Sequence, residues 1–226
     1  MQVLVTGGLG YIGSHTSVLL LEKGYDLVIV DDLSNSNEKV IENISQITSK
    51  VPVFEKIDLK DKESVSKLFN NYDFDGIIHF AAHKSVNESV NYPDKYFKNN
   101  VGSLENIIYE IQKLKKPMNF IFSSSCTVYG QADSMPINEG FELKKAESPY
   151  GQSKRKCEEI LENFHKAGHN FKNITLRYFN PIGAHPTSLI GELPIGIPEN
   201  LVPYITKTAV GKSCLLYTSP SPRDCI

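Results

Sequence analysis

The amino-acid sequence predicts a doubly wound α/β protein built on a parallel sheet. Short apolar runs alternate with longer amphipathic segments along most of the 226 residues. The first apolar run also leads directly into a glycine-rich turn. Strands that read as continuous apolar runs are typical of a parallel sheet that is covered on both faces. This length suits one large domain, or one domain and part of another.

The elements follow in order along the chain. Strands are predicted over residues 2–5, 27–30, 51–57, 77–80, 119–122 and 174–178, because each is a short apolar run. Between them, apolar residues recur at three- and four-residue spacings, which is the pattern of a helix with one buried face. The first helix covers residues 11–23 and ends before Gly24. Later helices are marked by Val40, Ile41, Ile44 and Ile47, by Val65, Leu68 and Phe69, by apolar residues from Val101 to Leu114, and by Ile160, Leu161 and Phe164 after a start at Ser148 and Pro149.

The composition changes after Asn180, where prolines and glycines replace the periodic pattern. We therefore expect a nucleotide-binding domain over residues 1–179 and the incomplete beginning of a substrate domain over residues 180–212. Residues 213–226 show no element pattern, and we expect them to be a foreign or disordered tail.

Composition narrows the function classes. The net charge is −2 and no run of lysine or arginine stands out, so we expect neither nucleic acid nor a membrane surface as a partner. The four cysteines match no disulfide or zinc pattern, and no metal site is expected. Without a signal peptide or a long apolar stretch, the sequence predicts a cytoplasmic protein.

The glycine-rich turn predicts a phosphate-binding site. Gly7, Gly8, Gly10 and Gly13 lie between the first strand and the first helix. Glycines in this context let the backbone approach a pyrophosphate, whose charge is stabilised by the helix N-terminus. A glycine-rich turn that binds no ligand is the alternative.

Asp31 indicates that the dinucleotide is NAD. It ends the second predicted strand about 20 residues beyond the turn, where a carboxylate accepts hydrogen bonds from the ribose and repels the extra phosphate of NADP. A strand-end aspartate that only caps its loop is the alternative, and Asp32 is the better candidate for that role. Asp58 and the segment from Phe80 to Lys84 also follow strands, at the edge where ligands bind in this fold.

Two segments match the pattern Tyr-x-x-x-Lys. Tyr109 and Lys113 lie within a long helix, and we interpret them as structural. Tyr150 and Lys154 open a later helix and follow the serines that end the fifth strand, so Ser125, Tyr150 and Lys154 are the candidate catalytic residues. A tyrosine has a pKa near 10 and acts as a base at neutral pH only if a nearby positive charge favours the phenolate. His83 is interpreted as a wall of the cofactor pocket.

Several segments resemble the extended short-chain dehydrogenase/reductase family, and within it the UDP-glucose 4-epimerase group. They are VLVTGGLGYIGSHT, IIHFAAHKSVNESV, NFIFSSSCTVYG, SPYGQSK, LRYFNPIGAHP and GIPENLVPYI. The resemblance covers residues 1–212 and implies a homodimeric, NAD-dependent isomerase that acts on a UDP-sugar. In such an enzyme Tyr150 is the base, Lys154 lowers its pKa, Ser125 assists, and the sugar C4 is oxidised and reduced again. Activity of this chain itself is not expected, because the resemblance implies a longer substrate domain.

The resemblance also implies the residues of both binding sites. Those implied for NAD are Gly7, Gly10, Tyr11, Ile12, Gly13, Asp31, Asp32, Asn35, Ser36, Asp58, Leu59, Phe80, Ala81, Ala82, Lys84, Asn99, Ser123, Tyr150, Lys154 and Tyr178. Those implied for the UDP-sugar are Ser125, Thr127, Tyr150, Phe179, Asn180, Asn200 and Leu201.

Three alternatives remain open at this stage. One is a 4-epimerase of another UDP-sugar, namely UDP-glucuronate, a UDP-pentose or a UDP-N-acetylhexosamine. A 4,6-dehydratase fits less well, because it needs an acidic pair where Ser125, Cys126 and Thr127 stand. A non-enzymatic NAD-binding module fits least, because such a protein has no need to keep serine, tyrosine and lysine together.

Overall fold

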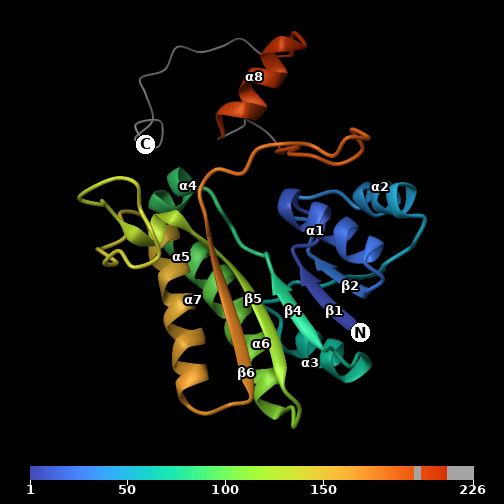
Figure 1. The fold of residues 1–226 in the computed structure, drawn as a ribbon, viewed down its shortest axis with the longest axis vertical. Coiled ribbons are helices and arrows are strands. Elements are labelled where there is room, and N and C mark those ends of the chain that lie inside the picture. The colour runs from blue at the N-terminus through green and yellow to red at the C-terminus, as the bar shows by residue number, and fades with distance from the viewer. Residues whose placement is uncertain (196–199, 213–226) are drawn as a thin grey trace.

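The computed structural model describes residues 1–195 and 200–212, and these form a six-stranded parallel sheet flanked by helices (Figure 1). The strand order is β3-β2-β1-β4-β5-β6, so the sheet grows in both directions from the β1–β4 pair. The predicted fold class is therefore confirmed. The strands are β1 (Gln2–Thr6), β2 (Asp26–Asp31), β3 (Val53–Lys56), β4 (Gly76–His79), β5 (Met118–Ser125) and β6 (Phe171–Tyr178).

Helices cover the two faces of the sheet in separate layers (Figure 1). On one face, Val3 and Val5 of β1 pack with residues of α1 and α2, whereas Leu4 points into the core beneath α3, α6 and α7 on the other face. This alternation explains why β1 reads as one apolar run. The larger helices are α1 (Tyr11–Glu22), α2 (Lys39–Thr48), α3 (Lys62–Asn71), α6 (Gly102–Lys113), α7 (Pro149–Lys166) and α8 (Leu201–Ala209).

Two strands differ from the expectation that both faces are buried. β3 and β6 lie at the edges of the sheet, and each is only partly covered. In β6, the side chains of Ile174 and Leu176 are 58% and 37% exposed, because the described residues cover only one face of this strand. The prediction was wrong here because an apolar sequence shows that a side chain can be buried, whereas its position in the sheet decides whether it is.

Several short elements were not predicted. They are α4 (Val86–Asn91), α5 (Pro93–Tyr96), η1 (Phe97–Val101) and η2 (Cys126–Tyr129). The hydroxyl of Ser85 accepts a hydrogen bond from the backbone N–H of Glu88 and caps α4, and Pro93 begins α5. Residues 201–204 lie in the segment whose sequence shows no periodic pattern, yet they begin α8.

After β6 the chain crosses the carboxyl edge of the sheet and returns to α1 and α2 (Figure 1). Ile190 is 3% exposed in the core on that face, and the Asn43 side-chain amide donates a hydrogen bond to the carbonyl oxygen of Leu189. Leu189 and Ile190 thus pack against the face of the sheet that α1 and α2 cover. The expected tail, 213–226, lies outside the described residues. None of the described helices is long and apolar enough to cross a membrane.

Candidate functional site

The glycine-rich turn lies at the carboxyl end of β1, where the sheet changes its direction of growth. Gly7 has φ of 64°, and a β-carbon there would lie 2.6 Å from the backbone nitrogen of Ala81. A β-carbon on Gly13 would lie 2.2 Å from the carbonyl oxygen of Gly7, so glycine lets α1 approach the turn closely. The N-terminus of α1 therefore lies close to the turn at the carboxyl edge of the sheet, and such a position suits an anionic group.

Asp31 ends β2 beside this turn and is 8% exposed. Its Oδ2 accepts a hydrogen bond of 3.1 Å from the backbone N–H of Leu9. Its Oδ1 accepts hydrogen bonds from the backbone N–H of Leu33 and from the hydroxyl of Ser36, at 3.0 and 2.6 Å. The carboxylate thus holds two loops in place, as a strand-end aspartate that caps its loop would do. It also lines a cavity.

A cavity of about 780 Å³ opens beside the turn and Asp31. Its lining includes predicted cofactor residues from the carboxyl ends of β1, β2, β3 and β4 and from η1. These are Gly7, Asp31, Asp32, Asn35, Ser36, Asp58, Leu59, Phe80, Ala81, Ala82, Lys84 and Asn99, together with Asn200, which was predicted for the sugar. Gly10, Tyr11, Ile12, Gly13, Ser123, Tyr150, Lys154 and Tyr178 do not line it.

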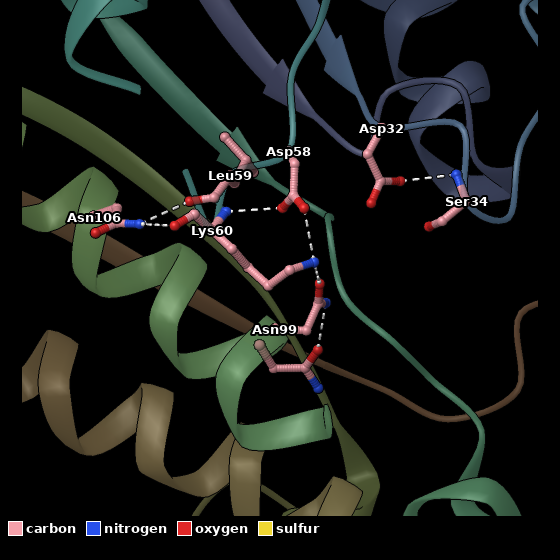
Figure 2. Close-up of polar contacts among 8 residues, drawn as sticks. Asp32, Ser34, Asp58, Leu59, Lys60, Asn99 and Asn106 are labelled. Atoms are coloured by element: carbon pink, nitrogen blue, oxygen red, sulfur yellow. Dashed lines mark hydrogen bonds and ion pairs between the residues drawn. The ribbon is translucent and has the colours of Figure 1, made fainter. Parts of the chain in front are cut away.

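Figure 2 shows a polar cluster on one side of this cavity. The Lys60 ammonium lies 3.0 Å from the Asp58 carboxylate and donates a hydrogen bond of 3.2 Å to Oδ1 of Asn99. The Asn106 amide donates to the carbonyl oxygens of Leu59 and Lys60 and holds this loop against α6. Sequence reasoning missed Lys60, because an isolated lysine in a loop carries no pattern.

Glu192 is a second residue that sequence reasoning missed. Its carboxylate lies 3.4 Å from the Lys84 ammonium and accepts a hydrogen bond of 2.6 Å from the Asn200 amide. These contacts connect lining residues of the cavity that come from separate segments of the chain. The phenol of Tyr11 donates to the carbonyl oxygen of Gly183 at 2.8 Å, which holds the same returning segment over α1.

Tyr150 lies in the first turn of α7 and is 8% exposed. The Ser148 hydroxyl caps this helix by accepting a hydrogen bond from the backbone N–H of Gly151. A β-carbon on Gly151 would lie 3.1 Å from the carbonyl oxygen of Thr127, so the start of α7 packs directly on the turn that follows Ser125. Residues more than 20 positions apart are thereby brought to one place.

Lys154 lies one helical turn beyond Tyr150 and is 3% exposed. Its ammonium donates a hydrogen bond of 2.7 Å to the carbonyl oxygen of Ser123 and lies 4.9 Å from the centre of the Phe122 ring. Burial lowers the pKa of Lys154 to about 8, while the nearby Cys157 and Glu158 oppose that shift. A lysine with this pKa can remain positively charged near neutral pH and can also lose its proton readily.

Ser125 ends β5, and its Oγ accepts hydrogen bonds from the backbone N–H and the hydroxyl of Thr127 at 3.3 and 3.0 Å. Its own proton can then be donated to a substrate oxygen. The serine, tyrosine and lysine predicted as catalytic thus come from one strand end and one helix start. By contrast, Tyr109 is 44% exposed on α6 and packs against the ammonium groups of Lys62 and Lys113.

The residues predicted for the sugar form no enclosed site among the described residues. Phe179, Asn180 and Leu201 are exposed. Tyr178, which was predicted for NAD, is half-buried beside Ser125 in the sheet register. The described part of the chain contains two arginines. Arg155 donates to the carbonyl oxygen of Lys144, and Arg177 pairs with Glu158. The same part of the chain holds no cluster of histidine, cysteine, aspartate and glutamate that could bind a metal ion.

Known proteins resemble this chain over most of its length. The chain is 47% identical over 214 residues to a UDP-glucose 4-epimerase of Schizosaccharomyces pombe, a match that covers 93% of this chain and 60% of that protein. It is 46% identical over 224 residues to the UDP-glucose 4-epimerase of Haemophilus influenzae, covering 99% of this chain and 66% of that protein. The chain thus spans less than two thirds of the length of these relatives.

Solved structures agree with the sequence comparison. A UDP-glucose 4-epimerase from Bifidobacterium longum in complex with NAD⁺ and UDP matches with a TM-score of 0.91 and 42% identity, over 94% of this chain and 63% of that one. Another, from Stenotrophomonas maltophila with bound NAD and formylated UDP-arabinopyranose, matches with a TM-score of 0.89 and 44% identity, over 93% of this chain and 62% of that one. Residues 4–219 match the family model described as GDP-mannose 4,6 dehydratase. The chain therefore belongs to the GDP-mannose 4,6 dehydratase family and is a homologue of UDP-glucose 4-epimerases.

Proposed function

We propose that this chain binds NAD and supplies the acid–base residues of an enzyme that interconverts UDP-glucose and UDP-galactose. One observation carries the proposal: the helix start with Tyr150 and Lys154 packs on the turn after Ser125, at the carboxyl edge of a parallel sheet. The relatives named UDP-glucose 4-epimerase, and the solved structures that contain NAD and UDP, support the same assignment.

The residues around the cavity fit NAD. Its volume of about 780 Å³ is in the range of cofactor pockets. The glycine turn and the α1 N-terminus suit the pyrophosphate, and the Asp31 carboxylate suits ribose hydroxyls while disfavouring a 2′-phosphate. Lys154 and Tyr178 would lie toward the nicotinamide ribose. When bound, NAD would supply the acceptor, and then the donor, of the hydride at the sugar C4.

The protein's own residues then move the proton. Tyr150 as phenolate accepts the proton of the sugar 4-hydroxyl, and the Lys154 ammonium favours that phenolate electrostatically. Ser125 donates a hydrogen bond to the same sugar oxygen. After the ketone has turned its other face, Tyr150 gives the proton back and the C4 configuration is inverted.

A second candidate is a 4-epimerase that also accepts other UDP-sugars. The UDP-Glc/GlcNAc 4-epimerase of Campylobacter jejuni, with 34% identity and a TM-score of 0.80, favours this reading. A homodimeric parent, which the sequence resemblance implies, and a cytoplasmic location are also part of the proposal. A dehydratase is disfavoured because Ser125, Cys126 and Thr127 provide no acidic side chain.

The function can be tested in a protein that joins residues 1–212 to the remaining third of the Haemophilus influenzae relative. This protein would be given UDP-galactose that carries deuterium at C4, and the product would be analysed by NMR. We expect UDP-glucose that retains deuterium at C4, because the hydride leaves and returns within one site. Loss of deuterium to solvent, or no product from any UDP-hexose, would contradict the proposal.

A further inference from the structure

The side chains of Glu158 on α7 and Arg177 on β6 form a bidentate ion pair behind the candidate catalytic residues. Arg177 donates from Nε to Oε1 at 3.1 Å and from Nη2 to Oε2 at 2.8 Å. The two side chains are only 11% and 21% exposed. Because two charges lose hydration here, such a pair adds little net stability, and its value lies in fixing geometry.

The pair contacts the chain on both sides of Ser125. Oε1 of Glu158 accepts a hydrogen bond of 2.5 Å from the hydroxyl of Ser124, the residue before it. The guanidinium of Arg177 lies 4.8 Å from the centre of the Tyr129 ring, in the turn that follows. Ser125 is therefore held between two segments that are both attached to one ion pair.

The pair also acts on Lys154. Lys154 and Glu158 are four residues apart on α7, so both lie on the helix face that meets the end of β5. Lys154 binds the carbonyl oxygen of Ser123, and Glu158 binds the hydroxyl of Ser124. Two successive turns of α7 are thereby fixed to two successive residues of β5, which sets the height of Lys154 above the strand.

We propose that Glu158, oriented by Arg177, is a positioning residue that aligns Lys154 with Ser125 at the nicotinamide end of the site. The inference rests on the proposed function. It also assigns Arg177 to Glu158 rather than to a substrate phosphate, since its Nε and Nη2 are both engaged.

The test uses the chain as it exists and two charge-conserving variants, Glu158→Asp and Arg177→Lys. Calorimetric titration with NAD and with adenosine monophosphate separates the two ends of the cofactor site. We expect each variant to bind NAD about ten- to hundredfold more weakly, because Lys154 is displaced from the nicotinamide end of the site. Affinity for adenosine monophosphate should not change, because Asp31 ends β2, and β1 and β4 separate β2 from β5, the strand that Glu158 contacts. Glu159→Gln is the matched control, since Glu159 is exposed on the same helix and pairs only with Lys156 among the described residues.

The outcomes separate this inference from the proposed function. Equal losses for both ligands, or no loss for NAD, would overturn the positioning role. If the unmodified chain bound no NAD, the proposed function would fail. The positioning role of Glu158 would then be tested by a pH titration of the Tyr150 phenol, which needs no cofactor. In that titration the phenolate absorbance of Tyr150, taken as the difference from Tyr150→Phe, should have a higher midpoint pH in Glu158→Asp. An unchanged midpoint would overturn the inference.

Discussion

The imidazole of His79 and the hydroxyl of Thr6 lie 2.7 Å apart, between the carboxyl ends of β4 and β1. This contact spans the two strands at which the sheet changes direction. The Thr6 hydroxyl also lies 3.5 Å from the backbone N–H of Ala81, which borders the cavity. The histidine is buried and stacks on the ring of Phe122, so it helps to fix the floor of the candidate cofactor site.

Burial, reinforced by the Lys154 charge, lowers the pKa of His79 to about 3 from 6.5. Below pH 6.5 the unfolded chain takes up a proton that the folded chain does not, so stability falls as the pH falls toward 3. Between pH 6.5 and about pH 5 this amounts to about 2 kcal/mol. We expect His79→Asn to reduce the pH dependence of the unfolding free energy by that amount in urea titrations. An unchanged slope would mean that His79 is protonated in the folded state.

Lys154 predicts a change in stability of the same sign at alkaline pH. Its folded pKa of about 8 lies below the ordinary 10.5, so between these values the unfolded state binds the extra proton. Stability from this group therefore rises with pH across that window. The wild type should gain about 2 kcal/mol over Lys154→Met between pH 8 and about pH 10. Taking the difference between the two proteins removes the contribution of Cys157, whose thiol pKa burial raises to about 12. Parallel profiles would contradict the lowered pKa.

Asp31 should determine the choice between NAD and NADP. Replacing it with serine removes the charge that would face a 2′-phosphate, so the preference for NAD should narrow in calorimetric titrations. The variant should also lose about 1 kcal/mol of stability or more, because the Leu9 and Leu33 amides lose their acceptor. Asp73→Asn is the control, since Asp73 does not line the cavity and its exposed carboxylate pairs with Lys116. Equal NAD and NADP affinities in the wild type would refute this role.

In the protein that joins residues 1–212 to the remaining third of the Haemophilus influenzae relative, Tyr150→Phe should lower turnover by about 10²–10⁴-fold. This is the usual contribution of general acid–base catalysis. The substitution removes only the phenol oxygen, so NAD affinity should remain nearly unchanged. Tyr109→Phe is the matched control, because it alters the other Tyr-x-x-x-Lys segment on an exposed helix face. Comparable losses at both positions would show that the choice between the two segments is wrong.

The sequence predicted the sheet and its central strands because their apolar runs are buried from both sides. It could not predict that Ile174 and Leu176 would be exposed, since that depends on which strand lies at the edge. The glycine turn, Asp31 and the Tyr150 helix were predictable because each is marked by residues that lie close together in the sequence or at the end of a predicted strand. Lys60, Glu192 and Glu158 were not, because their roles arise from partners that are distant in the sequence.

The central claim is that the described residues form an NAD site, whereas they form only part of the UDP-sugar site. Calorimetric titration of the 226-residue chain with NAD and with UDP-galactose tests it most directly. We expect one NAD per chain, bound far more tightly than UDP-galactose, because Arg155 and Arg177 are both engaged within the fold. The account would be contradicted by NAD binding weaker than a Kd of about 1 mM, or by UDP-galactose binding as tight as that of NAD.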